Sequence, residues 1–228
     1  MARPRAATYD DQRSQILKAA ADLFARRGYT AATLNEVASA SGVSKATLYH
    51  YFSDKHALLE DIVSSHVTRL QRIVAEAGAA SKEFPEGTQV AADARLRSLV
   101  RRFMQAYADA QSEHRVLTED VKFLDKRARG AVLDGQRQVV GAFAQGIAAC
   151  RPGLPAELHK PMAMLLFGMI NWTFTWLRPD GVLTYADLGD IVADLFFGGL
   201  PAVAAGLPVV GAPGLAQSQA DSPPAGLR

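Results

Sequence analysis

Four side chains able to bind DNA lie within six residues near the start of the chain, at Lys45, Thr47, Tyr49 and His50. A cation and a hydroxyl can bind phosphate oxygens, while hydrogen-bond donors and apolar edges can contact bases in the major groove. Their spacing suits the outward face of one short helix whose remaining residues face inward. The pattern predicts a helix that contacts both the DNA backbone and the bases.

The stretch from Thr33 to Lys55 supplies the elements that would hold this helix. A first short helix has an apolar face formed by Leu34, Val37 and Ala38. Gly42 then favours the left-handed conformation that ends helices, and Ser44 is a good N-cap for the second helix. The second helix is expected to pack through apolar side chains at three- and four-residue spacing, which are Leu48, Tyr51 and Phe52.

This stretch resembles the helix-turn-helix of TetR-family transcriptional regulators. TLNEVASASG is similar to that family's second helix, and VSKATLYHYFSDKHALL (43–59) is similar to its recognition helix and the start of its fourth helix. Two departures, Ala46 for a frequent glycine and Ser53-Asp54 for a frequent Pro-Ser, suit helix formation and N-capping. The resemblance implies an all-α fold and DNA contacts from Thr33, Ser44, Lys45, Thr47, Leu48, Tyr49, His50 and Lys55.

The charge distribution favours the same assignment. Residues 1–55 contain eight Lys or Arg and five Asp or Glu, a net charge of +3, whereas the remaining residues contain 17 and 18, a net charge of −1. Positive charge is therefore concentrated on the segment expected to meet DNA. The composition, 49% hydrophobic and 21% charged, is typical of a soluble globular protein of 228 residues.

Catalytic chemistry is not indicated by the sequence. It contains no Gly-x-Gly-x-x-Gly motif, phosphate loop or nucleophile elbow, and its five histidines lack metal-ligand spacing. We expect no cofactor, no metal and no enzymatic activity, and we interpret His114 as a surface group at a helix end. Cys150 is the single cysteine, so a reducing cytoplasm is the expected location, with a buried thiol favoured over a redox sensor.

The chain divides into three parts by its apolar pattern. Residues 1–55 are predicted to form the DNA-binding domain, with a flexible arm over residues 1–8, and a helix at 54–77 links it to a second domain at 56–206. Residues 207–228, rich in Pro, Gly, Ala and Ser, are predicted to be a disordered tail. The second domain shows helical periodicity throughout, and no stretch alternates with period two. Its expected helices span residues 90–110, 115–125, a long segment to 149, 154–177 and 184–204.

The last two expected helices, 154–177 and 184–204, are apolar around most of their circumference. Such helices must be buried on most sides. The resemblance implies that they form a four-helix bundle with a second copy, and a plain monomer core is the alternative. In a two-fold dimer, the two copies of the expected DNA-contacting helix would bind half-sites of a palindrome about 34 Å apart or a multiple of that.

An effector is also implied by a second, shorter resemblance. FGMINWTFTWLRPDG (167–181) is similar to a TetR subgroup that controls fatty-acid and sterol breakdown and responds to acyl-CoA thioesters, although Leu177 stands where an aromatic residue is common there. An acyl chain needs an apolar cavity and CoA phosphates need cations. The candidate effector contacts are Phe103, Met104, Tyr107, Phe143, Met169, Trp172, Trp176 and Arg178.

We therefore expect a homodimeric one-component repressor that is released from DNA by a small hydrophobic effector, such as a long-chain or polycyclic acyl-CoA. An activator, or a DNA-binding protein without effector control, is the alternative that this sequence leaves open.

Overall fold

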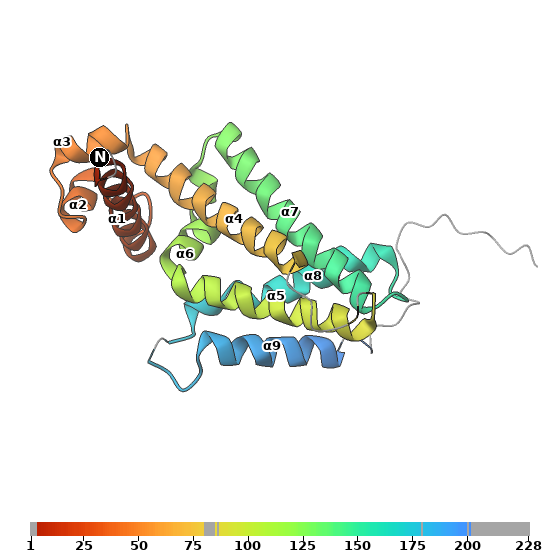
Figure 1. The fold of residues 1–228 in the computed structure, drawn as a ribbon. Coiled ribbons are helices and arrows are strands. Elements are labelled where there is room, and N and C mark those ends of the chain that lie inside the picture. Colours follow the sequence, from red (N-terminus) through yellow and green to blue (C-terminus); the bar gives the residue numbers. More distant parts are fainter. Residues whose placement is uncertain (1–3, 80–84, 86, 179, 200, 202–228) are drawn as a thin grey trace, which may run out of the picture.

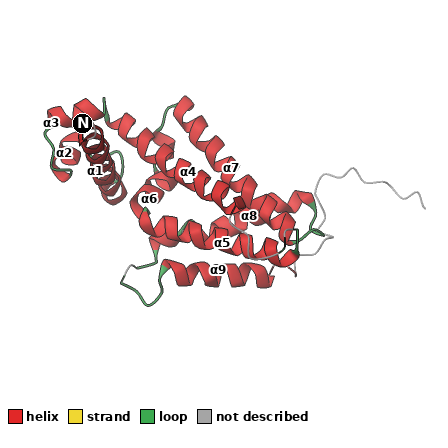
Figure 2. Cartoon of the chain, in the orientation of Figure 1, coloured by secondary structure: helices red, strands yellow, loops and turns green. Residues whose placement is uncertain are grey.

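The computed structural model describes residues 4–79, 85, 87–178, 180–199 and 201, and over these ranges the protein is all-α, as predicted (Figures 1 and 2). The described residues form α1 (Pro4–Arg27), α2 (Leu34–Ala40), α3 (Lys45–Tyr51), α4 (Lys55–Ala79), α5 (Gln89–Asp109), α6 (Gln111–Glu119), α7 (Lys126–Cys150), α8 (Ala156–Ile170) and α9 (Tyr185–Gly199), with the 3-10 helices η1 (Val121–Phe123) and η2 (Thr173–Thr175). We call α1 to α3 the head, which lies at one end of α4 in Figure 1.

Local capping explains where the helices of the head begin and end. The Thr33 hydroxyl accepts a hydrogen bond from the Glu36 N–H at 3.3 Å, and the Glu36 carboxylate accepts one from the Thr33 N–H at 2.9 Å, which forms a capping box. The turn after α2 passes through Gly42 with φ of +68°. Ser44 then caps α3 by accepting from the Thr47 N–H at 3.0 Å. The predicted roles of Gly42 and Ser44 are confirmed.

Two clusters of buried apolar side chains share α4. The head cluster contains residues of α1 to α3, the first half of α4, α6 and the start of α7, whereas the body cluster contains residues of the second half of α4, α5, α7, α8 and α9. Leu58, Ile62 and Val67 belong to the head cluster, and Leu70 and Ile73 belong to the body cluster. One helix therefore contributes to both cores, so neither core is closed without it.

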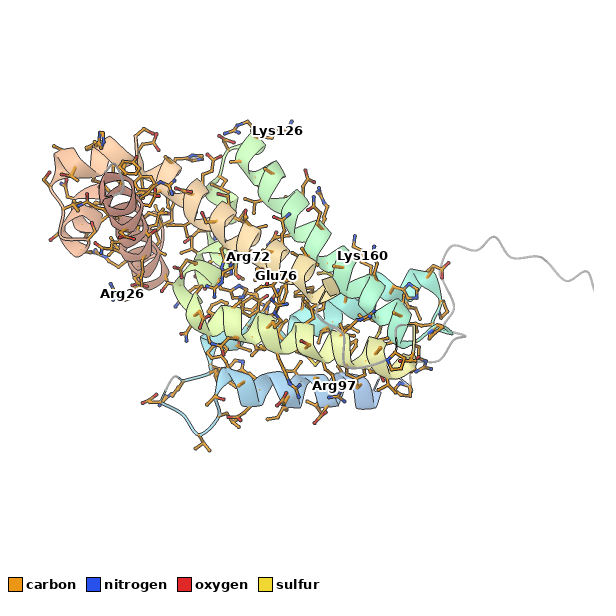
Figure 3. The ribbon with its side chains drawn as sticks, in the orientation of Figure 1. Arg26, Arg72, Glu76, Arg97, Lys126 and Lys160 are labelled. Carbon is orange, nitrogen blue, oxygen red and sulfur yellow. The ribbon has the colours of Figure 1, made fainter. Side chains whose placement is uncertain are left out.

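Close helix contacts fix α4 against α5 to α9, which we call the body. A Cβ atom added at Gly135 of α7 would lie only 2.5 Å from Val67 Cγ1, so the α4–α7 approach requires glycine at this position. Ion pairs link α5 to both neighbours, since Arg102 pairs with Glu76 of α4 and Arg97 pairs with Asp194 of α9. Arg97 is labelled beside α9 in Figure 3. These contacts hold α4 and α9 on α5.

Three helix predictions need correction. The helix expected at 154–177 ends at Ile170 and is followed by η2, because the chain after it is held by buried polar contacts described below. The arm expected at residues 1–8 is helical from Pro4 onward, because α1 begins there. The helix expected at 115–125 is instead α6 followed by η1.

The last helix begins as predicted. Thr184 accepts a hydrogen bond from the Asp187 N–H at 3.1 Å and donates to its carboxylate at 2.7 Å, which confirms Thr184 as the N-cap of α9. The expected tail at 207–228 lies outside the described residues.

Gly42 offers a direct test of the turn between the two short helices. We expect Gly42→Ala to lower the free energy of unfolding by about 1 to 2 kcal/mol, because a Cβ atom is strained at positive φ. Gly141→Ala is the matched control: no atom lies within 4 Å of the added Cβ in the middle of α7, and we expect a gain of about 0.5 to 1 kcal/mol. Urea unfolding measures both, and an equal effect of the two substitutions would contradict the assigned turn.

Candidate DNA-binding face and effector cavity

The side chains expected to contact DNA are mostly exposed on α3. Lys45, Tyr49 and His50 are exposed, and Thr47 is half-buried at the start of the helix. The Lys45 ammonium lies 5.9 Å from the centre of the Tyr49 ring, so the cation and the phenol form one surface. This face carries a positive charge and both donors and acceptors, which is the chemistry that phosphates and base edges require.

Thr33 and Ser44 combine exposure with capping. The Thr33 hydroxyl donates to the Glu36 carboxylate at 2.8 Å, and the Ser44 hydroxyl lies 2.8 Å from the Thr47 hydroxyl. Hydrogen bonds from Thr33, together with Arg27 nearby, lower the pKa of Glu36. The expected phosphate contacts of both hydroxyls stay predictions, and they would be made by groups that also hold the helix starts.

Leu48 is the clear exception in the candidate set. Its side chain is fully buried in the head cluster, so the expectation that it contacts DNA is wrong. Leu48 lies on the inner side of α3, where three- and four-residue spacing places it with Phe52. Its contribution is to hold the helix against the head.

Lys55 is held by main-chain groups. Its ammonium donates to the carbonyl oxygens of Tyr29, Thr30 and Ala32 at 2.8, 3.3 and 3.0 Å, and it lies 4.4 Å from the centre of the Tyr29 ring. An ammonium has three donors, and these carbonyls engage them all. Lys55 therefore joins the start of α4 to the α1–α2 connection, and its predicted phosphate contact would have to compete with these carbonyls.

Helix α1 supports α3 from behind. The Tyr51 hydroxyl donates to Gln12 Oε1 at 2.9 Å, and the ring of Tyr51 packs on the ring of Tyr9 with centres 4.5 Å apart. Arg13 of α1 forms an ion pair with Asp61 of α4. The orientation of α3 is thus set by α1 as well as by its own turn, and α1 is in turn held on α4.

A cavity of about 190 Å³ lies between α4, α5, α6, α7 and α8. Its lining residues are Val67, Leu70, Tyr107, His114, Leu117, Thr118, Gln136, Val139, Val140, Met164, Phe167 and Asn171. None of them is charged, and most are apolar. The cavity suits a compact neutral group, and α4 supplies part of its wall.

Buried polar groups form one side of this cavity. The Tyr107 hydroxyl donates to Asn171 Oδ1 at 2.9 Å, and His114 Nε2 lies 3.0 Å from the Asn171 carbonyl oxygen. A carbonyl only accepts, so Nε2 of His114 carries the proton and its Nδ1 is an acceptor. His66 Nε2, 3.4 Å from that Nδ1, is the donor. A chain of polar contacts thus runs from Asn171 to His66 of α4.

Both histidines are held in the neutral form. Burial lowers the pKa of His66 to about 3, with smaller effects from His114 and Arg69. Burial likewise lowers the pKa of His114 to about 4, although its contact with Asn171 acts in the opposite direction. The interpretation of His114 as a surface group is therefore wrong: it is 3% exposed and stacks on the Tyr107 ring with centres 3.7 Å apart.

The residues proposed from sequence to bind the effector fall into three groups. Tyr107 lines the cavity, whereas Phe103, Met104 and Phe143 are fully buried in the core behind it. Met169 is half-buried against the same core. The exposed residues of the set are Trp172, Trp176 and Arg178.

Sequence reasoning missed most of the lining, because five separate helices supply it. Among these residues, a histidine within an otherwise amphipathic α6 was a usable signal, since a buried polar side chain needs a partner. Cys150 is buried, as expected, and burial raises the pKa of its thiol to about 12. Over the described part of the chain, no helix is long and apolar enough to cross a bilayer.

The exposed α3 and the helical body with its cavity define a helix-turn-helix protein with a separate helical domain. Two family models match the chain: "Bacterial regulatory proteins, tetR family" over residues 16–62, and "Tetracyclin repressor-like, C-terminal domain" over residues 89–200. A TetR-family transcriptional regulator from Bordetella parapertussis 12822 has a similar crystal structure, with a TM-score of 0.74 and 31% identity over 84% of this chain and 97% of that one. The chain belongs to the TetR family of transcriptional regulators, which are DNA-binding proteins and not enzymes.

Further relatives differ in their identity to this chain and in the share of each chain that the match covers. The transcriptional repressor KstR2 of Rhodococcus jostii RHA1 is 25% identical over 180 residues, 76% of this chain and 83% of the relative. The transcriptional activator FasR of Mycolicibacterium smegmatis is 44% identical over 61 residues, and the match spans only 28% of that protein. The structure of AibR in complex with isovaleryl coenzyme A and operator DNA is similar in fold, with a TM-score of 0.67 and 23% identity over 81% of this chain and 97% of AibR.

Removal of the charge at Lys45 and at Lys55 is expected to affect different properties of the protein. Lys45→Met should lower the salt dependence of binding to duplex DNA by about one unit of slope, because one phosphate contact is lost, and should leave stability unchanged. Lys55→Met should instead lower the free energy of unfolding by about 1 to 3 kcal/mol, because three main-chain carbonyls lose a charged donor. Salt titrations of DNA binding and urea unfolding distinguish them. If Lys55→Met only lowers the salt slope, Lys55 is a phosphate contact as the sequence suggested.

The buried histidines predict a loss of stability in acid. The unfolded chain binds protons near pH 6.5 whereas the folded chain binds them near pH 4 and 3, so the free energy of unfolding should fall as pH drops from about 6.5 to 4. Each histidine contributes a slope of about 1.4 kcal/mol per pH unit within its window. His114→Gln should flatten this dependence, because it removes one of the two buried imidazoles. An unchanged slope in His114→Gln would mean that His114 is protonated in the folded state.

Proposed function

We propose that the protein is a homodimeric, one-component repressor that acts in the cytoplasm, binds a palindromic operator through α3 and is released by a small acyl effector. The observation that carries this proposal is the position of α4. Its first half packs in the core of the head through Leu58 and Ile62, and its second half lines the cavity through Val67 and Leu70. A group that fills the cavity therefore contacts the same helix that supports the DNA-binding face.

The domain assignment follows from the same helix. We propose that residues 1–55 bind DNA, that α4 is the mechanical link, and that the following residues to about 206 bind the effector and a second copy of the chain. DNA and effector would favour different positions of α4. Their binding would then be coupled, typically by about 1 to 3 kcal/mol.

Exposed apolar side chains on α8, on α9 and on both sides of η2 support the homodimer. Leu165 and Leu195 are 62% and 65% exposed, and Trp172 and Trp176 are each more than half exposed. Exposed apolar side chains concentrated on neighbouring elements mark protein interfaces. This dimer surface would comprise shorter helices than the segments 154–177 and 184–204 expected from sequence, since α8 ends at Ile170 and α9 is described to Gly199.

The cavity volume favours a short acyl group. Binding sites for drug-sized ligands span about 300 to 1,000 Å³, whereas this cavity measures about 190 Å³. A short or branched acyl chain would fit without rearrangement, and a CoA moiety would remain outside, where the exposed Arg178 is our candidate for its phosphates. The isovaleryl coenzyme A named with AibR belongs to this size class.

An activator is the second candidate. It is favoured by the match of 61 residues, 44% of them identical, to the activator FasR. The same DNA-binding face would serve both functions. A reporter gene under the operator distinguishes them, because loss of the protein raises transcription for a repressor and lowers it for an activator.

Footprinting of DNA upstream of its own gene and its neighbours tests the proposal. We expect a two-fold symmetric footprint that isovaleryl-CoA weakens and free CoA does not. Thr47 and Tyr49 substitutions should change sequence preference. A footprint that no acyl-CoA weakens, but that an unrelated metabolite does, would refute the effector class.

The dimer is tested by a charge placed on α9. Leu195→Asp should weaken both self-association and operator binding by at least about tenfold, because an unpaired carboxylate would be buried at the interface. Val182→Asp, at a fully exposed loop position, should change neither. Sedimentation equilibrium and operator titration provide the two measurements, and an unaltered dimer in Leu195→Asp would place the interface elsewhere.

A further inference from the structure

A second cavity lies in the body, between α4, α5 and α7. Its volume is about 340 Å³. Small and apolar residues form most of its wall, and the lining residues that matter here are Val74, Leu96, Leu99, Ala142 and Gly146. The first cavity, bounded by Leu70 of α4, Tyr107 of α5 and Val139 of α7, uses the same three helices. The two cavities therefore lie at successive positions along the same three helices.

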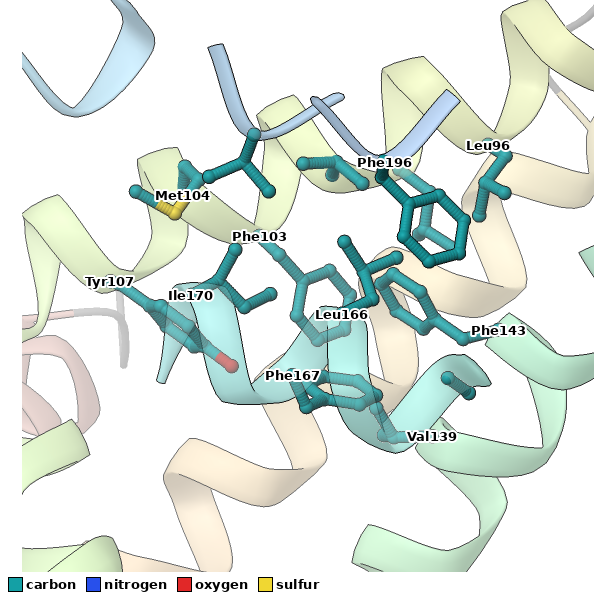
Figure 4. Close-up of a cluster of buried hydrophobic side chains, with 14 of the residues drawn as sticks. Leu96, Phe103, Met104, Tyr107, Val139, Phe143, Leu166, Phe167, Ile170 and Phe196 are labelled. Atoms are coloured by element: carbon teal, nitrogen blue, oxygen red, sulfur yellow. The ribbon is translucent and has the colours of Figure 1, made fainter. Parts of the chain in front are cut away.

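Along α5 and α7, two phenylalanines lie between the residues that line one cavity and the residues that line the other. On α5, Phe103 lies one turn beyond Leu99 of the second cavity and one turn before Tyr107 of the first. On α7, Phe143 lies one turn beyond Val139 of the first cavity and one turn before Gly146 of the second. Residues three or four positions apart share a helix face. Figure 4 shows Phe103 lying between Tyr107 and Leu96.

The rings of these two residues pack directly on each other. The rings of Phe103 and Phe143 meet edge to face with centres 4.9 Å apart, and both side chains are fully buried. Phe143 also packs on Phe167, which lines the first cavity, with centres 4.7 Å apart. Neither ring lines either cavity: the pair lies behind Phe167 and one turn from Val139, while Asn171 and His114 supply the polar side of the first cavity.

We infer that Phe143, supported by Phe103, sets the length of the apolar chain that the effector cavity accepts. This rests on the proposed effector-binding function of the first cavity. An apolar cavity of about 150 Å³ holds benzene, so the first cavity alone suits an acyl group of about six carbons. A smaller residue at position 143 joins it to the second cavity and admits a longer chain.

The test compares hexanoyl-CoA with dodecanoyl-CoA by isothermal titration calorimetry. The unaltered protein should prefer hexanoyl-CoA. In Phe143→Ala the affinity for dodecanoyl-CoA relative to hexanoyl-CoA should rise at least about tenfold, since about two further buried methylene groups supply that change. Phe143→Leu, which leaves a smaller opening, should give an intermediate ratio, and circular dichroism establishes that each variant is folded.

Phe196→Ala is the matched control. Phe196 is buried in the same cluster, at 5% exposure, but it belongs to α9, which supplies no lining residue to either cavity, so its loss should leave the ratio unchanged. Equal preference for the two thioesters in the unaltered protein would overturn the inference. So would an unchanged ratio in folded Phe143→Ala, or a change of similar size in Phe196→Ala.

The same titrations with 1-hexanol and 1-decanol separate this inference from the proposed effector class. A shift towards 1-decanol in Phe143→Ala supports length selection even where no acyl-CoA weakens operator binding, and only the effector class then fails. Binding of neither alcohol and neither thioester to the unaltered protein would overturn length selection, while the proposed DNA binding would stand.

Discussion

The structure depends on one helix that belongs to two hydrophobic cores. Leu58, Ile62 and Val67 of α4 pack with the head, and Leu70 and Ile73 pack with the body. Burial of apolar surface is the main favourable term in folding, so neither core can move away from α4 without exposing some of it. The close approach at Gly135 tightens this constraint, because Val67 of α4 leaves no space for a Cβ atom at Gly135 of α7. The position of the head is consequently tied to the packing of the body.

The polar contacts inside the body show how a cavity of uncharged groups is maintained. An unpaired buried polar group costs free energy comparable to a lost hydrogen bond, and here Tyr107, Asn171 and His114 satisfy one another. The same contacts explain why the chain stops being α-helical after Ile170. Asn171 offers its side chain to Tyr107 and its carbonyl to His114, and the buried Thr173 hydroxyl donates to the Ile170 carbonyl. The helix end and the polar side of the cavity are thus one feature.

This feature marks the limit of what the sequence could predict. The head was predictable because its signals are local: Gly42 and Ser44 act on the residues beside them, and the apolar spacing around Leu48 defines the inner face of α3. The end of α8 and the burial of His114 were not predictable, because the contacts behind them are distant in the chain. Asn171, just after α8, contacts His114 across 57 residues, and His114 contacts His66 across 48 residues. Leu48 shows a related limit. Its place in a DNA-binding motif indicated contact with DNA, whereas its apolar spacing indicated burial. The spacing gave the correct prediction, because Leu48 is buried. Cavities depend on how five helices meet, so the lining beyond Tyr107 had no local signal.

The two hydrophobic cores also determine how an effector could act at a distance. Interiors are close-packed, so a group that enters a full cavity must displace a wall rather than compress it. Around the first cavity, the aromatic contact of Phe103 with Phe143 lies behind the lining residue Phe167, whereas Val67 and Leu70 lie on the helix that continues into the head. Displacement of the aromatic pair would change which chain lengths fit. Displacement of α4 would change the separation of the two α3 helices in a dimer. Selectivity and release would then arise from different groups around the same cavity, and each could change by substitution without the other.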